Sequence, residues 1–190
     1  MLIIAFCGKK YSGKDEGCKY LSERYGFRQM DFSKDGLNPI LEKEGKAINR
    51  DNQVELVGKL RKEKGIDVLA KILSEKITGN STISGLRHKE EADYLRGKFK
   101  EGFYLIAVDA GDRIRYERSL KQKVKGEGEH SFEQFISREQ LPTERVIPET
   151  MKLADYTVTN NGTKEELYMQ VDQAICKLKA ENKKEKEPPT

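Results

Sequence analysis

The chain has 190 residues, 36% apolar and 36% charged, so its apolar blocks can build one core beneath a densely charged surface. A formal net charge of only +4 is too balanced for a nucleic-acid-binding protein, although the excess of Lys and Arg suits a site for small anions. Three scattered cysteines, no signal-peptide pattern and no apolar stretch near the roughly 20 residues of a membrane span predict a cytoplasmic protein that does not bind membranes.

Strand-like and helix-like segments alternate along the first half of the chain. Residues 2–7, LIIAFC, form a continuous apolar run ended by Gly8, as expected of a strand buried on both faces. Apolar spacing and stop signals predict the elements that follow: a helix over 14–25, a short strand over 27–30, a helix over about 51–64, a helix from Asp67 to 78–80, and a strand over 82–86.

The second half continues the alternation. The run FYLIAVDA at 103–110 is the clearest strand after the first, and the charged, Gly-containing stretch 121–130 predicts a mobile loop. Ser131 with Gln134 and Thr163 with Glu166 have the spacing of capping boxes. The remaining predicted elements are a helix through 92–99, a helix over 113–121, a strand over 156–160 and a final helix before a disordered tail at 181–190.

Five strands separated by helices predict a parallel sheet covered on both faces, in one three-layer α/β domain over residues 1–180. Ligands of such sheets bind at the carboxyl ends of the strands. Two charged inserts, at about 34–64 and 119–150, are therefore predicted to be moving parts above that edge.

The segment after the first strand, Gly8-Lys9-Lys10-Tyr11-Ser12-Gly13-Lys14-Asp15, matches the phosphate-binding pattern GxxxxGK. Its glycines let the backbone curl around phosphate oxygens, successive N–H groups point inward, and the next helix offers its positive N-terminus. Lys14 adds a point charge for the β- and γ-phosphates. The Ser or Thr that usually follows the lysine and reaches Mg²⁺ is here Asp15, followed by Glu16, and a carboxylate is also a good Mg²⁺ ligand.

The loop GKKYSGKD resembles that of viral deoxynucleoside monophosphate kinases and animal-type phosphomevalonate kinases, which carry Gly-Lys-Asp at this place. Residues 154–167, ADYTVTNNGTKEEL, resemble the last strand and final helix of dephospho-CoA kinases. Residues 48–65, 84–95 and 108–118 are similar to a wider group of nucleoside-monophosphate-kinase-like proteins. That group includes the P-loop segment ahead of the deaminase domain in some dCMP deaminases. The resemblance covers most of residues 1–178 and implies a P-loop kinase fold, with ATP and Mg²⁺ as cofactors.

The resemblance also implies roles for individual residues. The donor nucleotide would contact the loop and the segments near the adenine, namely Gly8, Lys9, Tyr11, Ser12, Gly13, Lys14, Asp15, Glu16, Arg115, Asn160, Asn161 and Gly162. The acceptor's phosphate would be held by Arg87, helped by Arg50, Arg61 and Arg138. Arg118 would approach the transferring phosphoryl group or the adenine, Asp31 would orient or deprotonate an acceptor hydroxyl, and Asp15 and Asp109 would serve the metal. Relatives often have an acidic residue where this chain has Ser84.

Three functions agree with this sequence. The leading hypothesis is a kinase that phosphorylates a small phosphate-bearing acceptor, most readily a (deoxy)nucleoside monophosphate. A dephospho-CoA kinase is the alternative enzyme, and it would need the base that Asp31 offers. A nucleotide-binding module without kinase activity is favoured by Asp15, Glu16 and Ser84. A zinc deaminase is disfavoured, because the chain lacks H-x-E and P-C-x-x-C.

Overall fold

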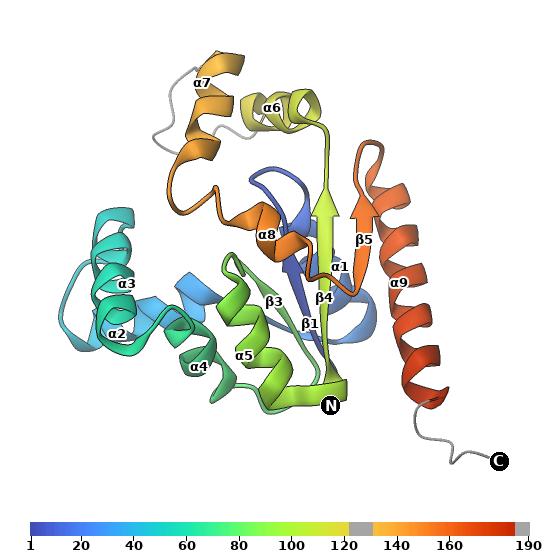
Figure 1. The fold of residues 1–190 in the computed structure, drawn as a ribbon, viewed down its shortest axis with the longest axis horizontal. Coiled ribbons are helices and arrows are strands. Elements are labelled where there is room, and N and C mark those ends of the chain that lie inside the picture. Colours follow the sequence, from blue (N-terminus) through green and yellow to red (C-terminus); the bar gives the residue numbers. More distant parts are fainter. Residues whose placement is uncertain (122–130, 185–190) are drawn as a thin grey trace.

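The predicted strands form one five-stranded parallel sheet in the computed structural model, which describes residues 1–121 and 131–184 (Figure 1). The strand order is β2-β3-β1-β4-β5, so the first strand lies at the centre. The strands are β1 (Ile3–Cys7), β2 (Arg28–Asp31), β3 (Ser81–Ser84), β4 (Phe103–Asp109) and β5 (Tyr156–Thr159). The predicted three-layer α/β architecture is therefore confirmed.

Side chains of β1 alternate between two hydrophobic cores, one on each face of the sheet. Ile4 and Phe6 pack with helices α1 (Lys14–Tyr25) and α9 (Lys164–Lys184). Ile3, Ala5 and Cys7 point to the other face, which is covered by α3 (Arg50–Lys64), α4 (Val68–Ser74) and α5 (Lys89–Phe99). Because β1 is buried on both faces, its continuous apolar run needs no polar alternation.

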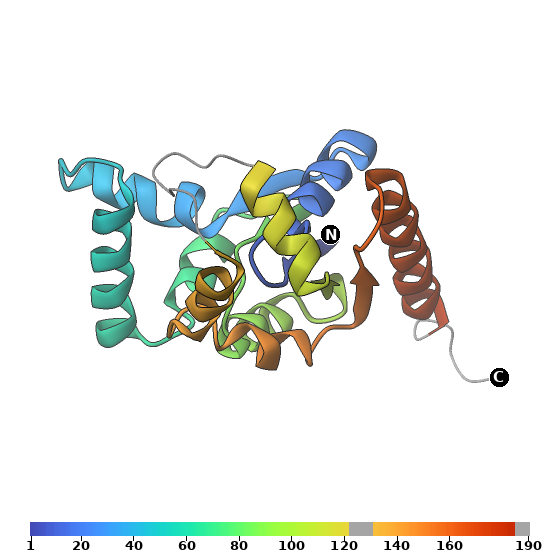
Figure 2. The same cartoon turned by 90° about the horizontal axis from the view of Figure 1, so that it is seen from above.

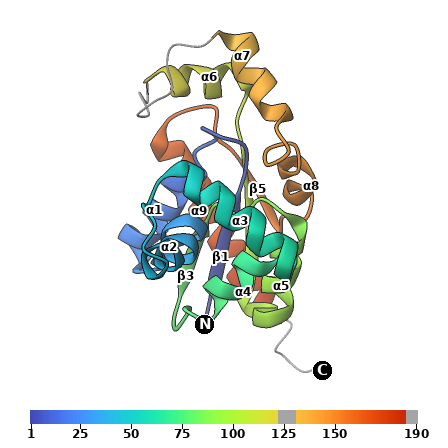
Figure 3. The same cartoon turned by 90° about the vertical axis from the view of Figure 1, so that its left-hand side faces the viewer.

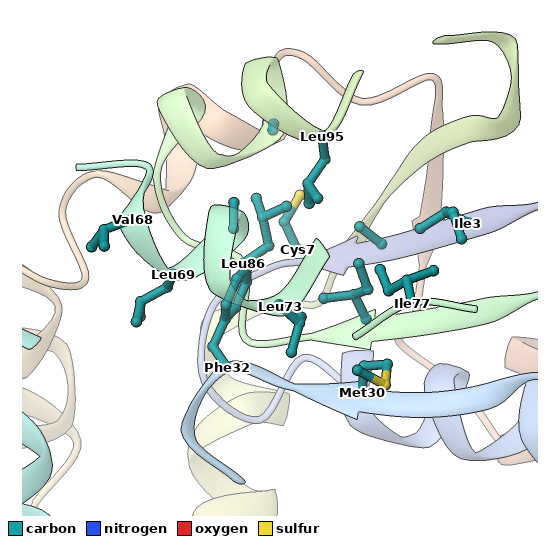
Figure 4. Packing of buried hydrophobic residues seen from close by; sticks show 14 of the residues in the cluster. Ile3, Cys7, Met30, Phe32, Val68, Leu69, Leu73, Ile77, Leu86 and Leu95 are labelled. Atoms are coloured by element: carbon teal, nitrogen blue, oxygen red, sulfur yellow. The ribbon is translucent and has the colours of Figure 1, made fainter. Parts of the chain in front are cut away.

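The larger core joins the sheet to the first insert and to helices α4 and α5. In Figure 4, Phe32 and Met30 lie near Leu73 and Ile77, while Leu86 lies beside Cys7 and Leu95 above it. Helices of widely separated chain segments thus share one apolar interior.

The first insert contains more regular structure than its polar sequence indicates. A single π-turn segment, η1 (Phe32–Leu37), follows β2 directly and leads into α2 (Asn38–Lys43). The carboxylate of Asp31 starts η1 by accepting hydrogen bonds from the backbone N–H groups of Ser33 and Lys34, both at 2.8 Å. Helix α3 follows, and Figure 2 shows it at the opposite end of the molecule from α9.

The second insert lies above the carboxyl ends of the strands. It begins at the end of α6 (Asp112–Lys121) and continues through α7 (Phe132–Ser137) and the short 3₁₀ turn η3 (Arg138–Gln140) into α8 (Ile147–Met151). Elsewhere in the chain, a further 3₁₀ turn, η2 (Lys100–Gly102), leads into β4. Figures 1 and 3 show α6 and α7 above the sheet. The capping boxes at Ser131 and Thr163 form as predicted. The stretch predicted as a mobile loop lies, except for its first residue, outside the described residues.

Some boundaries differ from the sequence predictions. Strand β3 ends at Ser84 because Gly85 takes a left-handed conformation, with φ of 87°, and turns the chain out of the sheet. Helix α4 ends at Ser74, before the predicted stop at 78–80. Helix α9 continues to Lys184, past the point where the disordered tail was predicted to begin. Over residues 1–121 and 131–184, no helix is long and apolar enough to cross a membrane.

Candidate nucleotide and acceptor site

The loop between β1 and α1 has the curled backbone that its glycines predict. Gly8 and Gly13 both have positive φ, at 150° and 101°. A Cβ on Gly8 would lie 2.3 Å from the carbonyl oxygen of Val108, and one on Gly13 would lie 2.1 Å from Nδ2 of Asn160. Gly8 is therefore required by close backbone packing and Gly13 by the buried Asn160 side chain, and Gly13 directly precedes the N-terminus of α1, where an anion is favoured.

Residues far along the chain hold this loop from behind. The Asn160 side chain donates to the carbonyl of Ser12 at 2.7 Å. The Arg118 guanidinium donates to the carbonyls of Tyr11 at 3.3 Å and Asn160 at 2.9 Å. These donors use the outward carbonyls of the loop. Arg118 and Asn160, which the resemblance placed at the phosphoryl group and the adenine, thus also brace the loop.

Inside the loop, the groups suited to phosphate and metal lie together. The Ser12 hydroxyl is buried and has no hydrogen-bond partner among residues 1–121 and 131–184. Lys14 Nζ lies 3.5 Å from the carboxylate of Asp15, whose side chain is 71% exposed. An unpaired hydroxyl, a lysine and one accessible carboxylate fit a nucleotide phosphate with Mg²⁺, since Mg²⁺ in kinases takes one or two carboxylates together with phosphate oxygens.

Glu16 faces away from this cradle. Its carboxylate accepts hydrogen bonds from Tyr168 and Lys164 of α9. Burial acts to raise the pKa of Glu16, but the bond from Tyr168 and the charge of Lys164 outweigh it and hold the pKa below its usual range. The first turn of α1 therefore directs Asp15 to the pocket and Glu16 to the helix interface, and the structure gives no contact of Glu16 to the loop.

The segment predicted to lie by the adenine follows β5. Asn161 accepts a hydrogen bond from the backbone N–H of Gly111 at 2.8 Å, which ties this segment to the start of α6. At Gly162 a Cβ would lie 1.6 Å from a Glu166 oxygen, so the capping box leaves no space for a side chain there. Both residues thus shape the turn that connects β5 to α9.

The second insert contacts the loop through one carboxylate. Glu139 accepts from Lys9 Nζ at 2.7 Å and also pairs with Arg115. Arg115 is fully buried, and its guanidinium further contacts Asp112 at 2.5 Å and the Lys10 carbonyl at 3.3 Å. The rings of Tyr11 and Phe135 lie 6.0 Å apart above the loop. Arg138 lines a small cavity there with Lys9, Lys10, Tyr11, Phe135, Glu139 and Glu144.

A larger pocket of about 230 Å³ opens beside Lys14 and contains most of the predicted acceptor residues. Arg50, Arg61 and Arg87 line it together with Lys14, Asp15 and Asp31. The apolar part of the wall comes from the first insert and α4, namely Phe32, Leu37, Val54, Val57 and Leu69. Cationic groups from three separate segments therefore surround one cavity at the carboxyl edge of the sheet.

Two further predicted residues have other structural tasks. Besides capping η1, Asp31 accepts a hydrogen bond from the Ser84 hydroxyl at 3.0 Å, so both of its carboxylate oxygens are engaged. Asp109, predicted to serve the metal, has an exposed side chain at the end of β4 and does not line the pocket that contains Lys14 and Asp15. Among the described residues, no group of three or more His, Cys, Asp or Glu is placed to hold a metal ion.

Two acidic residues without a predicted role form ion pairs with Arg61 and Arg87, two of the arginines predicted to hold the acceptor. Glu91, at the start of α5, is buried and accepts from Arg61 NH2 at 2.9 Å. Glu144, in the second insert, lies 3.5 Å from Arg87 NH2. Thr150 donates to the Arg87 carbonyl at 2.7 Å. The spacing Glu91 to His88 resembles a helix cap, but no local pattern indicates a partner 30 residues away.

Two buried cysteines near the loop, Cys7 and Cys18, have pKa values that burial affects more than nearby charges do. Burial raises the pKa of the Cys7 thiol to about 12, although Lys14 lies near enough to oppose the shift. It raises the pKa of Cys18 on α1 to about 12 as well. These thiols stay protonated at neutral pH and pack in the core, whereas the third cysteine, Cys176, is exposed.

Solved structures with a similar fold include a gluconokinase and shikimate kinases. A gluconokinase from Sinorhizobium meliloti superposes with a TM-score of 0.59 at 13% identity, and the match covers 98% of each chain. A shikimate kinase from Acinetobacter baumannii gives 0.56 at 17% identity, covering 93% of this chain and 94% of that one. Together with the loop geometry, these neighbours define the molecule as a protein with the P-loop kinase fold.

Sequence relatives identify the family. A UPF0200 protein of Thermoplasma volcanium is 30% identical over 171 residues, which are 87% of this chain and 92% of the relative. A UPF0200 protein of Thermococcus kodakarensis is 29% identical over its whole length. The chain therefore belongs to the UPF0200 family. It spans only 56% of a UPF0200/UPF0201 protein of Archaeoglobus fulgidus, at 27% identity. No protein-family model matches the sequence.

Proposed function

We propose that this protein is an ATP-dependent kinase that transfers the γ-phosphoryl group to a small phosphate-bearing acceptor, most readily a (deoxy)nucleoside monophosphate. The observation that carries the proposal is the shared pocket of Lys14, Asp15, Arg50, Arg61 and Arg87. Three arginines beside a phosphate-binding loop are more positive charge than ATP alone requires, and arginine is suited to bidentate phosphate binding.

The remote wall of the pocket suits a flat, mostly apolar group. Helix α3 presents Arg50, Gln53, Val54, Val57 and Arg61 on its pocket face, and Gln53 lies about 12 Å from Arg61 along the axis at ~1.5 Å per residue. The Gln53 amide nitrogen donates to Asn38 at 2.7 Å, which leaves the amide oxygen as an acceptor. This arrangement favours a ring bearing an exocyclic amino group, as in cytosine or adenine.

The engagement of Asp31 favours a phosphate acceptor over a hydroxyl acceptor. Two backbone N–H groups and the Ser84 hydroxyl already donate to its oxygens. A hydroxyl acceptor, such as that of dephospho-CoA, needs a group to take its proton, whereas a monophosphate is already anionic. We therefore place dephospho-CoA kinase activity second.

In the proposed reaction the protein positions groups and neutralises charge. The loop amides and Lys14 would hold the donor phosphates, Arg87 and Arg61 the acceptor phosphate, and Asp15 the Mg²⁺ that offsets phosphate charge. Arg118 and Arg115 keep the loop and the lid in place through their backbone contacts. The second insert above the loop would exclude water, which otherwise competes as acceptor.

The rival function is a nucleotide-binding module without kinase activity, and one observation favours it. The Lys14 ammonium lies within 3.5 Å of the Asp15 carboxylate, which reduces the positive charge offered to the γ-phosphate. Nucleotide binding is common to both functions, so acceptor turnover must distinguish them.

The test is ADP formation from ATP and Mg²⁺ with CMP, dCMP, AMP, dTMP, GMP and dephospho-CoA added separately. We expect stimulation by amino-bearing monophosphates first. An Arg87→Ala change should weaken acceptor use by about 10²-fold while ATP affinity changes little, because one charge-assisted bidentate contact is lost. A Lys14→Ala variant is the control that should lose turnover for every acceptor. ATP binding without stimulation by any acceptor would replace the kinase proposal with the silent module.

A further inference from the structure

Glu91 occupies the junction between the two acceptor arginines. It lies in the first turn of α5, and 1% of its side chain is exposed. One carboxylate oxygen accepts from Arg61 NH2 at 2.9 Å, and the other accepts from the backbone N–H groups of Arg87 and His88, both at 3.1 Å. A single buried carboxylate thus joins helix α3 to the segment that carries Arg87.

Helix capping explains two of these three contacts. The bonds to the backbone of Arg87 and His88 belong to the cap of α5, and a glutamine at this position would satisfy them equally well. The contact to Arg61 is different, because it needs a hydrogen-bond acceptor at Oε1, the carboxylate oxygen that the cap does not use. An amide would present N–H donors to a guanidinium there if its oxygen kept the cap.

Arg61 also shows an unexplained donor. Its Nε is buried and has no hydrogen-bond partner within the described parts of the chain, although its NH2 is held and the side chain lines the acceptor pocket. Buried guanidinium donors are rarely left unpaired, because the loss of water is costly without a replacement partner. Because this atom has almost no accessible surface in the structure, the Arg61 guanidinium would have to turn toward the pocket before an anionic oxygen could supply that partner.

We propose that Glu91 is a positioning residue for acceptor recognition: it holds the Arg61 guanidinium beside the pocket, where this group donates to an acceptor phosphate oxygen, and it fixes the Arg87 backbone next to it. The proposal rests on the proposed function for the identity of the acceptor. It does not require turnover, since the two arginines would present the same donors to inorganic phosphate.

The first measurement follows the Arg61 Nε–H signal by ¹⁵N NMR while inorganic phosphate is added. In the wild-type protein this signal should shift with phosphate, and in Glu91→Gln the shift should require at least tenfold more phosphate. The Glu90→Gln variant is the matched control, because Glu90 lies in the same turn and is exposed. An unshifted wild-type signal, or equal titrations in wild type and Glu91→Gln, overturns the proposal.

The second measurement uses the acceptor found in the ADP assay. Glu91→Gln should raise the acceptor KM at least tenfold with kcat and ATP affinity nearly unchanged, and it should add nothing further in an Arg61→Ala background. Should Glu91→Gln fail to fold, Glu91→Asp replaces it, since the shorter carboxylate cannot reach both Arg61 and the cap of α5 and should also require at least tenfold more phosphate. A phosphate shift without turnover by any acceptor rejects the kinase function and leaves the role of Glu91 standing.

Discussion

The phosphate loop and the acceptor wall lie side by side but are built in different ways. Eight consecutive residues, 8–15, form the loop, whose backbone is proposed to bind phosphate and is held by hydrogen bonds from Asn160 and Arg118. The acceptor wall is our name for the lining of the pocket of about 230 Å³, whose side chains come from η1, α3, the start of α5 and the second insert. The buried carboxylates of Glu91 and Glu144 pair with its arginines Arg61 and Arg87. The loop is therefore a local structure, whereas the wall exists only in the complete fold.

This difference predicts unequal responses to substitution. In the loop, an added Cβ meets the Val108 backbone at Gly8 and the buried Asn160 side chain at Gly13, so stability and nucleotide binding should fall together. In the wall, removing one charged partner leaves the fold intact and changes affinity. The following variants test this contrast.

The largest effect is expected for Gly13→Ala. The new Cβ would lie 2.1 Å from Asn160 Nδ2, on a residue with φ of 101°, so the Asn160 side chain would have to move and give up its hydrogen bond to the Ser12 carbonyl. We expect a loss of about 2–4 kcal/mol in the free energy of unfolding, measured by urea denaturation, together with a loss of ATP binding.

Gly97→Ala is the matched control for that change. Gly97 lies within α5 with no atom within 4 Å of its added Cβ, so alanine should stabilise the protein by about 0.5–1 kcal/mol. Equal behaviour of the two variants would show that the loop is not held as tightly as its contacts indicate.

A smaller effect is expected for Glu144→Gln in the acceptor wall. Removing this carboxylate frees Arg87 NH2, 3.5 Å away, for the acceptor phosphate. Acceptor affinity should rise about three- to tenfold, equivalent to roughly 1 kcal/mol for a partly buried pair, as measured by calorimetry. Glu149→Gln removes an exposed carboxylate from the same insert and should have no effect. Weaker acceptor binding in Glu144→Gln would mean that the ion pair supports the bound state instead.

The smallest effect concerns His88 at the start of α5. Burial, followed by the Arg61 charge, lowers the pKa of His88 below its ordinary value of 6.5, despite the opposing carboxylates of Glu91 and Glu90. The unfolded chain then binds a proton more readily than the folded one. This contribution to stability is therefore complete above the ordinary pKa and declines as the pH falls below it.

The variant His88→Asn separates this titration from the cap, because asparagine is a good N-cap residue. Between about pH 7.5 and 5.5, its melting temperature should fall less than that of the wild-type protein. Parallel melting curves for the two proteins over that range would refute the role of His88.

The parts of the molecule predicted from sequence are those encoded by neighbouring residues. The run 2–7, the glycines of the loop and the capping boxes at Ser131 and Thr163 each carry their signal within a few residues. The short elements η1, α2 and α8 were missed, because they are too brief for helical periodicity and depend on packing from the core.

The site was predictable to the same extent. Lys14, Arg61 and Arg87 do line one pocket, but the sequence did not show that Asp31 would cap η1 or that Glu16 would face α9. Glu91 and Glu144 escaped notice because their partners lie 30 and 57 residues away, and acidic residues are frequent on any charged surface. Such pairings depend on tertiary structure, which single-sequence patterns do not report.

The second insert brings its own anions to the cationic site. Glu139 lies against Lys9 and Arg115, and Glu144 against Arg87, where phosphate oxygens would bind. A bound phosphate would then replace glutamate carboxylates as the partner of these lysine and arginine side chains, instead of binding to cations that have no anionic partner. Fewer bound counterions would be released than the number of lysines and arginines suggests, so ligand affinity should depend only weakly on salt concentration.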